Sequence, residues 1–131
     1  MGLKTYTSEQ AKKLILSGKL PPNTIVEGYL DLNGCTYLQS LPDGLKVEGW
    51  LGLYGCTSLQ YLSNDLKVVG WLYLKGCPSL QLPYGIPEGV KGEVWVDEEV
   101  LRNNKEHLLT MVNTDFGEES KELYKKILAE G

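Results

Sequence analysis

Three cysteines are the residues of this sequence whose type and spacing most directly suggest chemistry. Cys35, Cys56 and Cys77 recur every 21 residues, and the chain has no other cysteine. Thiols in this number could form a disulfide, bind a metal ion or act as nucleophiles. The single histidine, His107, would then be needed as a fourth zinc ligand or as the base of a thiol protease.

The arrangement of these residues disfavours each of the three chemistries. The odd number of cysteines argues against disulfides, and no pair has the CxxC spacing of a metal site. The GxSxG, HExxH and P-loop motifs are also absent. We therefore expect a reduced, buried ladder of structural cysteines, no metal or cofactor, and a protein that is not an enzyme. Asp31, Glu48 and Asp97 would be the carboxylates to test for hydrolytic chemistry.

The cysteines belong to a longer repeat that must position them. Three segments align without gaps: VEGYLDLNGCTYLQSLPDGLK from Val26, VEGWLGLYGCTSLQYLSNDLK from Val47, and VVGWLYLKGCPSLQ from Val68. A partial repeat precedes them from Leu20, and a degenerate one, IPEGVKGEVWV, follows from Ile86. A fixed period of 21 residues is typical of a solenoid, in which each unit buries its apolar side on its neighbours.

The first seven positions of each repeat alternate between apolar and outward-facing residues. In the second repeat Val47, Leu51 and Leu53 lie on one side, and Glu48 and Trp50 lie on the other. This alternation predicts one short strand per coil. Strands of successive coils should pair in parallel about 4.8 Å apart, so that equivalent residues form columns.

The repeat resembles those of the leucine-rich-repeat family. The segments LDLNGCTYL, LGLYGCTSL and LYLKGCPSL are similar to the cysteine-containing LxLxGCTxL form of the family's strand segment. LPDGL and IPEGV resemble the LPxxL element of its short bacterial repeats. Over residues 20–96 the resemblance implies an α/β fold, a right-handed solenoid with a parallel, concave sheet.

Residues 1–19 and 97–131 are predicted to be helical caps, because the open ends of a solenoid would otherwise expose strand edges. Thr7 and Gln10 form a capping-box pattern at the start of the N-terminal helix, and Gly18 can end it. At the C-terminal end, Asp97 can begin a helix that runs to about Val112.

A second helix of the C-terminal cap is predicted to open with Asp115 and Glu118 and to end near Ala129. Val112 is expected to belong to the buried side of the first helix, and Phe116 to that of the second. The two helices could instead dock on a second copy of the protein, which would make it a dimer.

The outward positions of the predicted strands collect aromatic residues. One column is expected to hold every tryptophan of the chain, and glutamates at positions 27, 48 and 93 should line its edge. In leucine-rich-repeat proteins this strand face is the surface that holds a partner, and tyrosine and tryptophan are common binding hot spots. The predicted partner-binding residues are Tyr29, Trp50, Trp71, Trp95, Tyr54, Tyr73, Asp31, Glu48 and Lys75.

We therefore expect a non-enzymatic module that binds a partner protein through its aromatic strand face. As a short stand-alone repeat protein, this chain resembles those encoded by bacteria and their phages. The resemblance implies inhibition of a host protein as one use. A carbohydrate-binding module that uses the tyrosine and tryptophan platform is the alternative function. The rings could also serve only to stabilise the sheet, or a cap helix could cover them.

Composition narrows the partners further. The formal net charge is -4, and Arg102 is the one arginine among 13 basic residues, so nucleic acid is disfavoured. No stretch approaches the roughly 20 apolar residues that a membrane span needs. The first residues lack the cleavage site of a secretory signal, so we expect a cytoplasmic protein.

Overall fold

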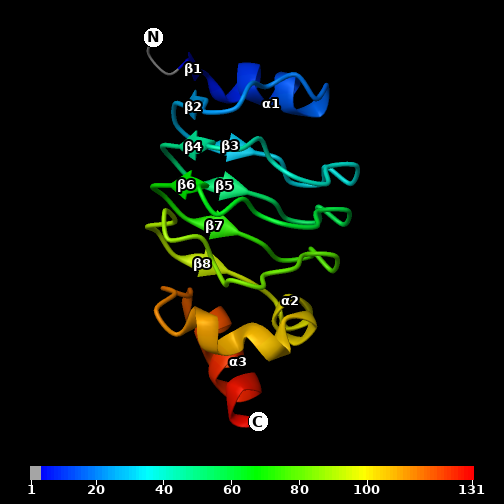
Figure 1. The fold of residues 1–131 in the computed structure, drawn as a ribbon, viewed down its shortest axis with the longest axis vertical. Coiled ribbons are helices and arrows are strands. Elements are labelled where there is room, and N and C mark those ends of the chain that lie inside the picture. The colour runs from blue at the N-terminus through cyan, green and yellow to red at the C-terminus, as the bar shows by residue number, and fades with distance from the viewer. Residues whose placement is uncertain (1–3) are drawn as a thin grey trace.

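The computed structural model describes residues 4–131 and shows a β-solenoid of about four turns. Parallel strands stack along the long axis, and helices flank the stack at both ends (Figure 1). The predicted solenoid with helical ends is therefore confirmed. Residues 1–3, which were assigned to the N-terminal cap, lie outside the described residues.

Each coil carries two short strands, so the prediction of one strand per coil was wrong. The strands form two parallel four-stranded sheets, in which equivalent residues of successive coils lie side by side. Sheet A contains β1 (Thr5–Tyr6), β2 (Ile25–Val26), β4 (Lys46–Val47) and β6 (Lys67–Val68). Sheet B contains β3 (Leu30–Asp31), β5 (Leu51–Gly52), β7 (Leu72–Tyr73) and β8 (Val94–Trp95).

The chain bends between the two strands of each coil at a column of glycines. The amide of Gly49 donates to the carbonyl of Gly28 at 2.8 Å, and the amide of Gly70 donates to that of Gly49 at 3.0 Å. A Cβ atom added to Gly70 would lie 2.7 Å from the carbonyl carbon of Gly49. The backbones of successive coils thus touch at this glycine corner, which separates sheet A from sheet B.

Leucine columns fill the interior of the solenoid. The strand segments contribute the fully buried Leu30, Leu32, Leu51, Leu53, Leu72 and Leu74, and the return segments contribute Leu59 and Leu80. Burial of one leucine side chain stabilises a fold by about 2 kcal/mol. Because each leucine packs between its equivalents in neighbouring coils, the columns hold the coils together along the axis.

The N-terminal cap begins with β1, which extends sheet A, and continues as α1 (Ser8–Leu16), which packs against β3. Thr7 and Gln10 form the predicted capping box. The helix ends before Gly18, whose φ of 71° lies in the left-handed region. Together the two elements cover β2 of sheet A and β3 of sheet B.

The C-terminal cap departs from the prediction of one long helix after Asp97. Asp97 caps α2 (Glu98–Asn103) as expected, but the chain then continues as the 3-10 helix η1 (Lys105–Met111). Asn104 is fully buried, and its Oδ1 atom accepts a hydrogen bond from the Leu82 amide at 2.7 Å. This bond ties the chain to the last coil at the point where the α-helix ends. Val112, predicted to be buried, is 60% exposed.

The last helix, α3 (Glu118–Ala129), begins later than the sequence suggested. Gly117 is its N-cap, and Asp115 does not cap it. The carbonyl of Asp115 accepts instead from the Val94 amide at 2.8 Å, and Phe116 forms a parallel bridge with Val94. Residues 115–117 therefore continue sheet B beyond β8 before α3 starts.

We expect Gly70→Ala to lower the free energy of unfolding by about 3 kcal/mol, because its methyl group would force two coil backbones apart. Gly34→Ala is the matched control. Gly34 has a φ of 77° and no atom within 4 Å of its added Cβ, so only the left-handed strain of about 1 kcal/mol applies. Urea unfolding of both variants measures the difference. Equal destabilisation would contradict the close contact at the glycine corner.

Candidate functional site

Six aromatic side chains are in contact on the outside of sheet B, where Trp95 packs on Trp71 with ring centroids 5.7 Å apart, at the margin of the other five. We call the cluster of the other five the aromatic face. It consists of Tyr29, Trp50, Trp71, Tyr73 and Tyr54. Tyr29, Trp50 and Trp71 precede β3, β5 and β7 in the chain, so the stacking of the coils alone brings them into one column.

The rings of the aromatic face pack on one another. Tyr29 and Trp50 are stacked, with ring centroids 4.8 Å apart and an interplanar angle of 13°. The ring of Tyr73 meets Trp50 edge-on at 6.0 Å and stacks on Tyr54 at 5.7 Å. The Trp50 side chain leans over Gly52, where an added Cβ would lie 2.8 Å from its Cζ3 atom. Gly52 therefore leaves the space that the indole occupies.

The aromatic face remains in contact with solvent. Tyr29 is 48% exposed, Trp71 is 44% exposed and Tyr54 is 39% exposed, while Trp50 and Tyr73 are half-buried. Partial burial, with smaller contributions from Tyr54 and Glu93, raises the pKa of the Tyr73 hydroxyl. These side chains hold one another in place and still expose ring surface to solvent.

Trp95 lies in a different column from the one predicted. The strand register pairs it with Tyr73, and the position next to Trp71 is taken by Glu93. The last coil is one residue longer than the others, since Val68 bridges Val90 at an interval of 22 residues. Alignment by residue type had placed Trp95 with the other tryptophans, and Glu93 with the glutamates.

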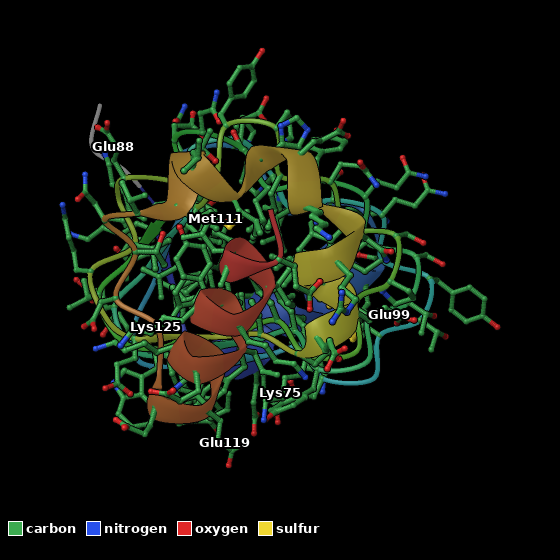
Figure 2. All side chains as sticks on the ribbon, turned by 90° about the horizontal axis from the view of Figure 1, so that it is seen from below. Lys75, Glu88, Glu99, Met111, Glu119 and Lys125 are labelled. Carbon is green, nitrogen blue, oxygen red and sulfur yellow. The ribbon has the colours of Figure 1, made fainter. Side chains whose placement is uncertain are left out.

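The C-terminal cap covers Trp95. A Cβ atom added to Gly117, the N-cap of α3, would lie 2.2 Å from the indole. Lys75 places its Nζ atom 5.7 Å from the Trp95 ring centroid and 3.7 Å from the Glu119 carboxylate, and both labelled side chains lie on one side of the cap in Figure 2. Trp95 and Lys75 thus join the solenoid to α3 at the margin of the aromatic face.

Acidic groups border the aromatic face on the side of the glycine corner. Glu27 and Glu48 are exposed there, and Val69 continues their column as an exposed apolar side chain. Asp31 is half-buried, and its carboxylate accepts a hydrogen bond from the Asn33 amide at 3.0 Å. The carboxylate of Asp31 thus bonds to its own loop, whereas Glu27 and Glu48 extend into solvent.

The three cysteines are free thiols in one column. Cys56 and Cys77 are fully buried, and their Sγ atoms donate to the carbonyls of Leu32 at 3.2 Å and Leu53 at 3.1 Å in the preceding coil. Burial raises the pKa of the Cys56 thiol to about 11 and that of Cys77 to about 12. Cys35 is half-buried, and its pKa is raised for the same reason.

Within residues 4–131 no three histidine, cysteine or acidic side chains lie close enough together to hold a metal ion. His107 lies in η1 beside Glu106, with its Nε2 atom 3.7 Å from that carboxylate. The helices of the described chain also include none that is long and apolar enough to cross a bilayer.

The sequence did not indicate a second surface feature, a cavity of about 420 Å³ beyond the end of sheet A. It lies between residues 86–91 of the last coil and residues 110–115 of the cap. The sequence signal that could have revealed it is the 22-residue interval from Val68 to Val90, which leads on to Val112 beyond the last repeat.

Searches with models of protein families, among curated proteins and among solved structures find no match to this chain. The site must therefore be interpreted from its own geometry.

The cysteine column predicts an order of reaction with iodoacetamide. At pH 8 the Cys56 thiol is almost entirely protonated, because burial raises its pKa to about 11. We expect the partly exposed Cys35 to be alkylated at least ten times faster than Cys56 or Cys77, and a rise in pH to speed all three reactions. Mass spectrometry of the labelled peptides measures the rates, and unfolding in urea should equalise them. Equal rates in the folded protein would contradict the buried positions.

Proposed function

We propose that this protein is a non-enzymatic interaction module that binds a partner protein through the aromatic face. The observation that carries the proposal is the continuous cluster of rings in which Tyr29, Trp71 and Tyr54 keep 39–48% of their surface exposed. Tyrosine and tryptophan supply most of the energy at many interfaces, because they bury a large area with few rotatable bonds.

The packing of the rings favours binding for a second reason. A side chain that is mobile in the free protein loses about 0.5–1.5 kcal/mol of conformational freedom when an interface immobilises it. Trp50 is already held between Tyr29 and Tyr73. The aromatic face is thus organised before a partner arrives, and less of the binding energy is lost in ordering it.

The charges around the aromatic face indicate the chemistry of the partner. Glu27 and Glu48 are exposed and precede Tyr29 and Trp50 by two residues in the chain. A lysine or arginine side chain of a partner could pair with these carboxylates while its cation lies over an aromatic ring. We therefore propose a partner surface that combines apolar groups with Lys or Arg.

The repeat class, the location and the mode of action form the rest of the proposal. The buried Leu51, Leu53 and Cys56 support membership of the leucine-rich-repeat class, because they are the inward residues of its LxLxGCTxL segment. Three unpaired thiols suit a reducing compartment such as the cytoplasm. Binding through one rigid face would act by covering a surface of the partner, as in a bacterial or phage inhibitor.

Carbohydrate binding is the less favoured use of the same residues. A sugar ring needs the free face of an aromatic ring, but Tyr29 and Trp50 cover one another at 4.8 Å, and Tyr54 and Tyr73 do so at 5.7 Å. Fluorescence quenching of tryptophan by a soluble sugar would support this alternative.

We expect Trp71→Ala to weaken partner binding by about 2 kcal/mol, or roughly thirtyfold, as at other tryptophan hot spots. Tyr61→Ala is the matched control, because Tyr61 is 51% exposed but lies outside the aromatic face. Both variants and the wild type serve as baits in a lysate of the native host, and the affinity for any captured protein is then measured by calorimetry. Equal binding by the Trp71→Ala and wild-type proteins, with unchanged melting temperatures, would contradict the proposed site.

A further inference from the structure

The two sheets end differently at the C-terminal end of the solenoid. Sheet B continues beyond β8, because Phe116 bridges Val94. Sheet A ends at Val90, which bridges Val68 of the coil before it. The carbonyls of Val90 and Gly92 accept no hydrogen bond from any residue between positions 4 and 131. Sheet A therefore finishes with two unpaired acceptors.

The equivalent carbonyls of earlier coils are paired with two consecutive amides of the next coil. The carbonyl of Val26 accepts from the Glu48 amide at 3.0 Å, and the carbonyl of Gly28 accepts from the Gly49 amide at 2.8 Å. The following pair of coils repeats both bonds at 3.0 Å. The unpaired acceptors thus mark the place and direction of one further parallel strand.

The chain itself contains a candidate for that strand. Val112 follows Val90 by 22 residues, which is the interval between Val68 and Val90 and between Val94 and Phe116. In this register Val112 would lie inside the solenoid, as the next valine of its column. It is instead 60% exposed, so the segment around it has not joined sheet A.

A threonine accounts for this failure to pair. Thr114 stands two residues after Val112, where the repeats VEG, VVG and VKG have glycine. A Cβ atom added to Gly92, the last glycine of the corner, would lie 2.2 Å from the carbonyl oxygen of Gly70. The side chain of Thr114 would meet the backbone of Gly92 in the same way, and residues 112–114 therefore stay outside.

The unfilled strand position is the groove of about 420 Å³ at this end. Ile86, Val90 and Val94 supply apolar surface to its lining, and Glu88, Lys91 and Asp115 supply charged groups. In Figure 2, which views the molecule from the C-terminal end, Glu88 lies at the periphery of this end. A groove of this kind is open to an extended chain from outside.

We propose that this groove binds an extended peptide of a partner protein as an added strand of sheet A, parallel to residues 88–92. The peptide carries valine or isoleucine over Val90 and glycine two positions later. The β-branched residue continues the inward column of Val26, Val47, Val68 and Val90. The glycine avoids the backbone of Gly92, and its amide and the preceding amide donate to the two unpaired carbonyls.

A peptide with the sequence of residues 43–49, DGLKVEG, is a suitable probe, because it contains the VEG pattern of a natural coil and ends at the glycine, before the positions over Glu93 and Val94 that residues 115–116 already occupy. We expect saturable binding by fluorescence anisotropy, with amide shifts in the NMR spectrum of the protein confined to residues 84–92 and 110–115. Methylation of the nitrogens of the peptide's glutamate and last glycine removes both donors and should weaken binding by about tenfold or more. Replacement of the peptide's last glycine by alanine should have a similar effect.

Two variants of the full chain complete the test. Thr114→Gly should allow residues 112–114 to fill the groove and should weaken peptide binding by about tenfold or more, whereas Thr114→Ser keeps the Cβ atom and should bind as the wild type does. The proposal is overturned if the peptide does not bind at concentrations up to about 1 mM. Equal binding of the N-methylated peptide, or shifts on the aromatic face instead, would also overturn it.

Discussion

The contact between coil backbones at the glycine corner is the constraint on which the rest of this structure depends. At Gly49 and Gly70 the backbones of successive coils are too close for any side chain. The amide of each glycine donates directly to the equivalent glycine carbonyl of the preceding coil. This contact fixes the distance between coils. It also fixes the register, because a shift by one residue would place a Cβ atom between two backbones. The leucine columns and the Cys56 thiol, which reaches the carbonyl of Leu32, all follow the same spacing.

The aromatic face is a consequence of that spacing. Tyr29 and Trp50, which occupy the same position in neighbouring coils, stack on one another, whereas Trp50 meets Tyr73 of the adjacent column edge-on. Trp50 stacks on Tyr29 and leans over Gly52, which is the one position of its column without a side chain. Such packing stabilises the sheet by about 0.5–1.5 kcal/mol for each ring pair. This packing does not bury the rings, because no other described element lies over them except at Trp95, which α3 covers. The side chains that we propose as the binding surface therefore also stabilise sheet B.

The period of the repeat was sufficient to predict the solenoid, its helical ends and the outward tyrosines and tryptophans. The second strand of each coil could not be predicted, because the alternation in VEGWLGL continues through the glycine corner and carries no sign of a bend. Trp95 was misplaced, since residue types suggested one column while the longer last coil sets another. Val112 has the helical spacing of a buried residue after Leu108, but the hydrogen bonds of Asn104 end the α-helix before it.

The two ends of the solenoid differ in whether sheet A is covered, and a single side chain, that of Thr114, accounts for the difference. At the N-terminal end β1 and α1 cover both sheets, but at the C-terminal end the chain covers sheet B and leaves sheet A open. Joining residues 112–114 to sheet A would add two hydrogen bonds of about 1 kcal/mol each. The overlap of the Thr114 side chain with the backbone of the preceding coil would cost up to about 3 kcal/mol. The open arrangement is therefore favoured by the same backbone contact that holds the other coils together.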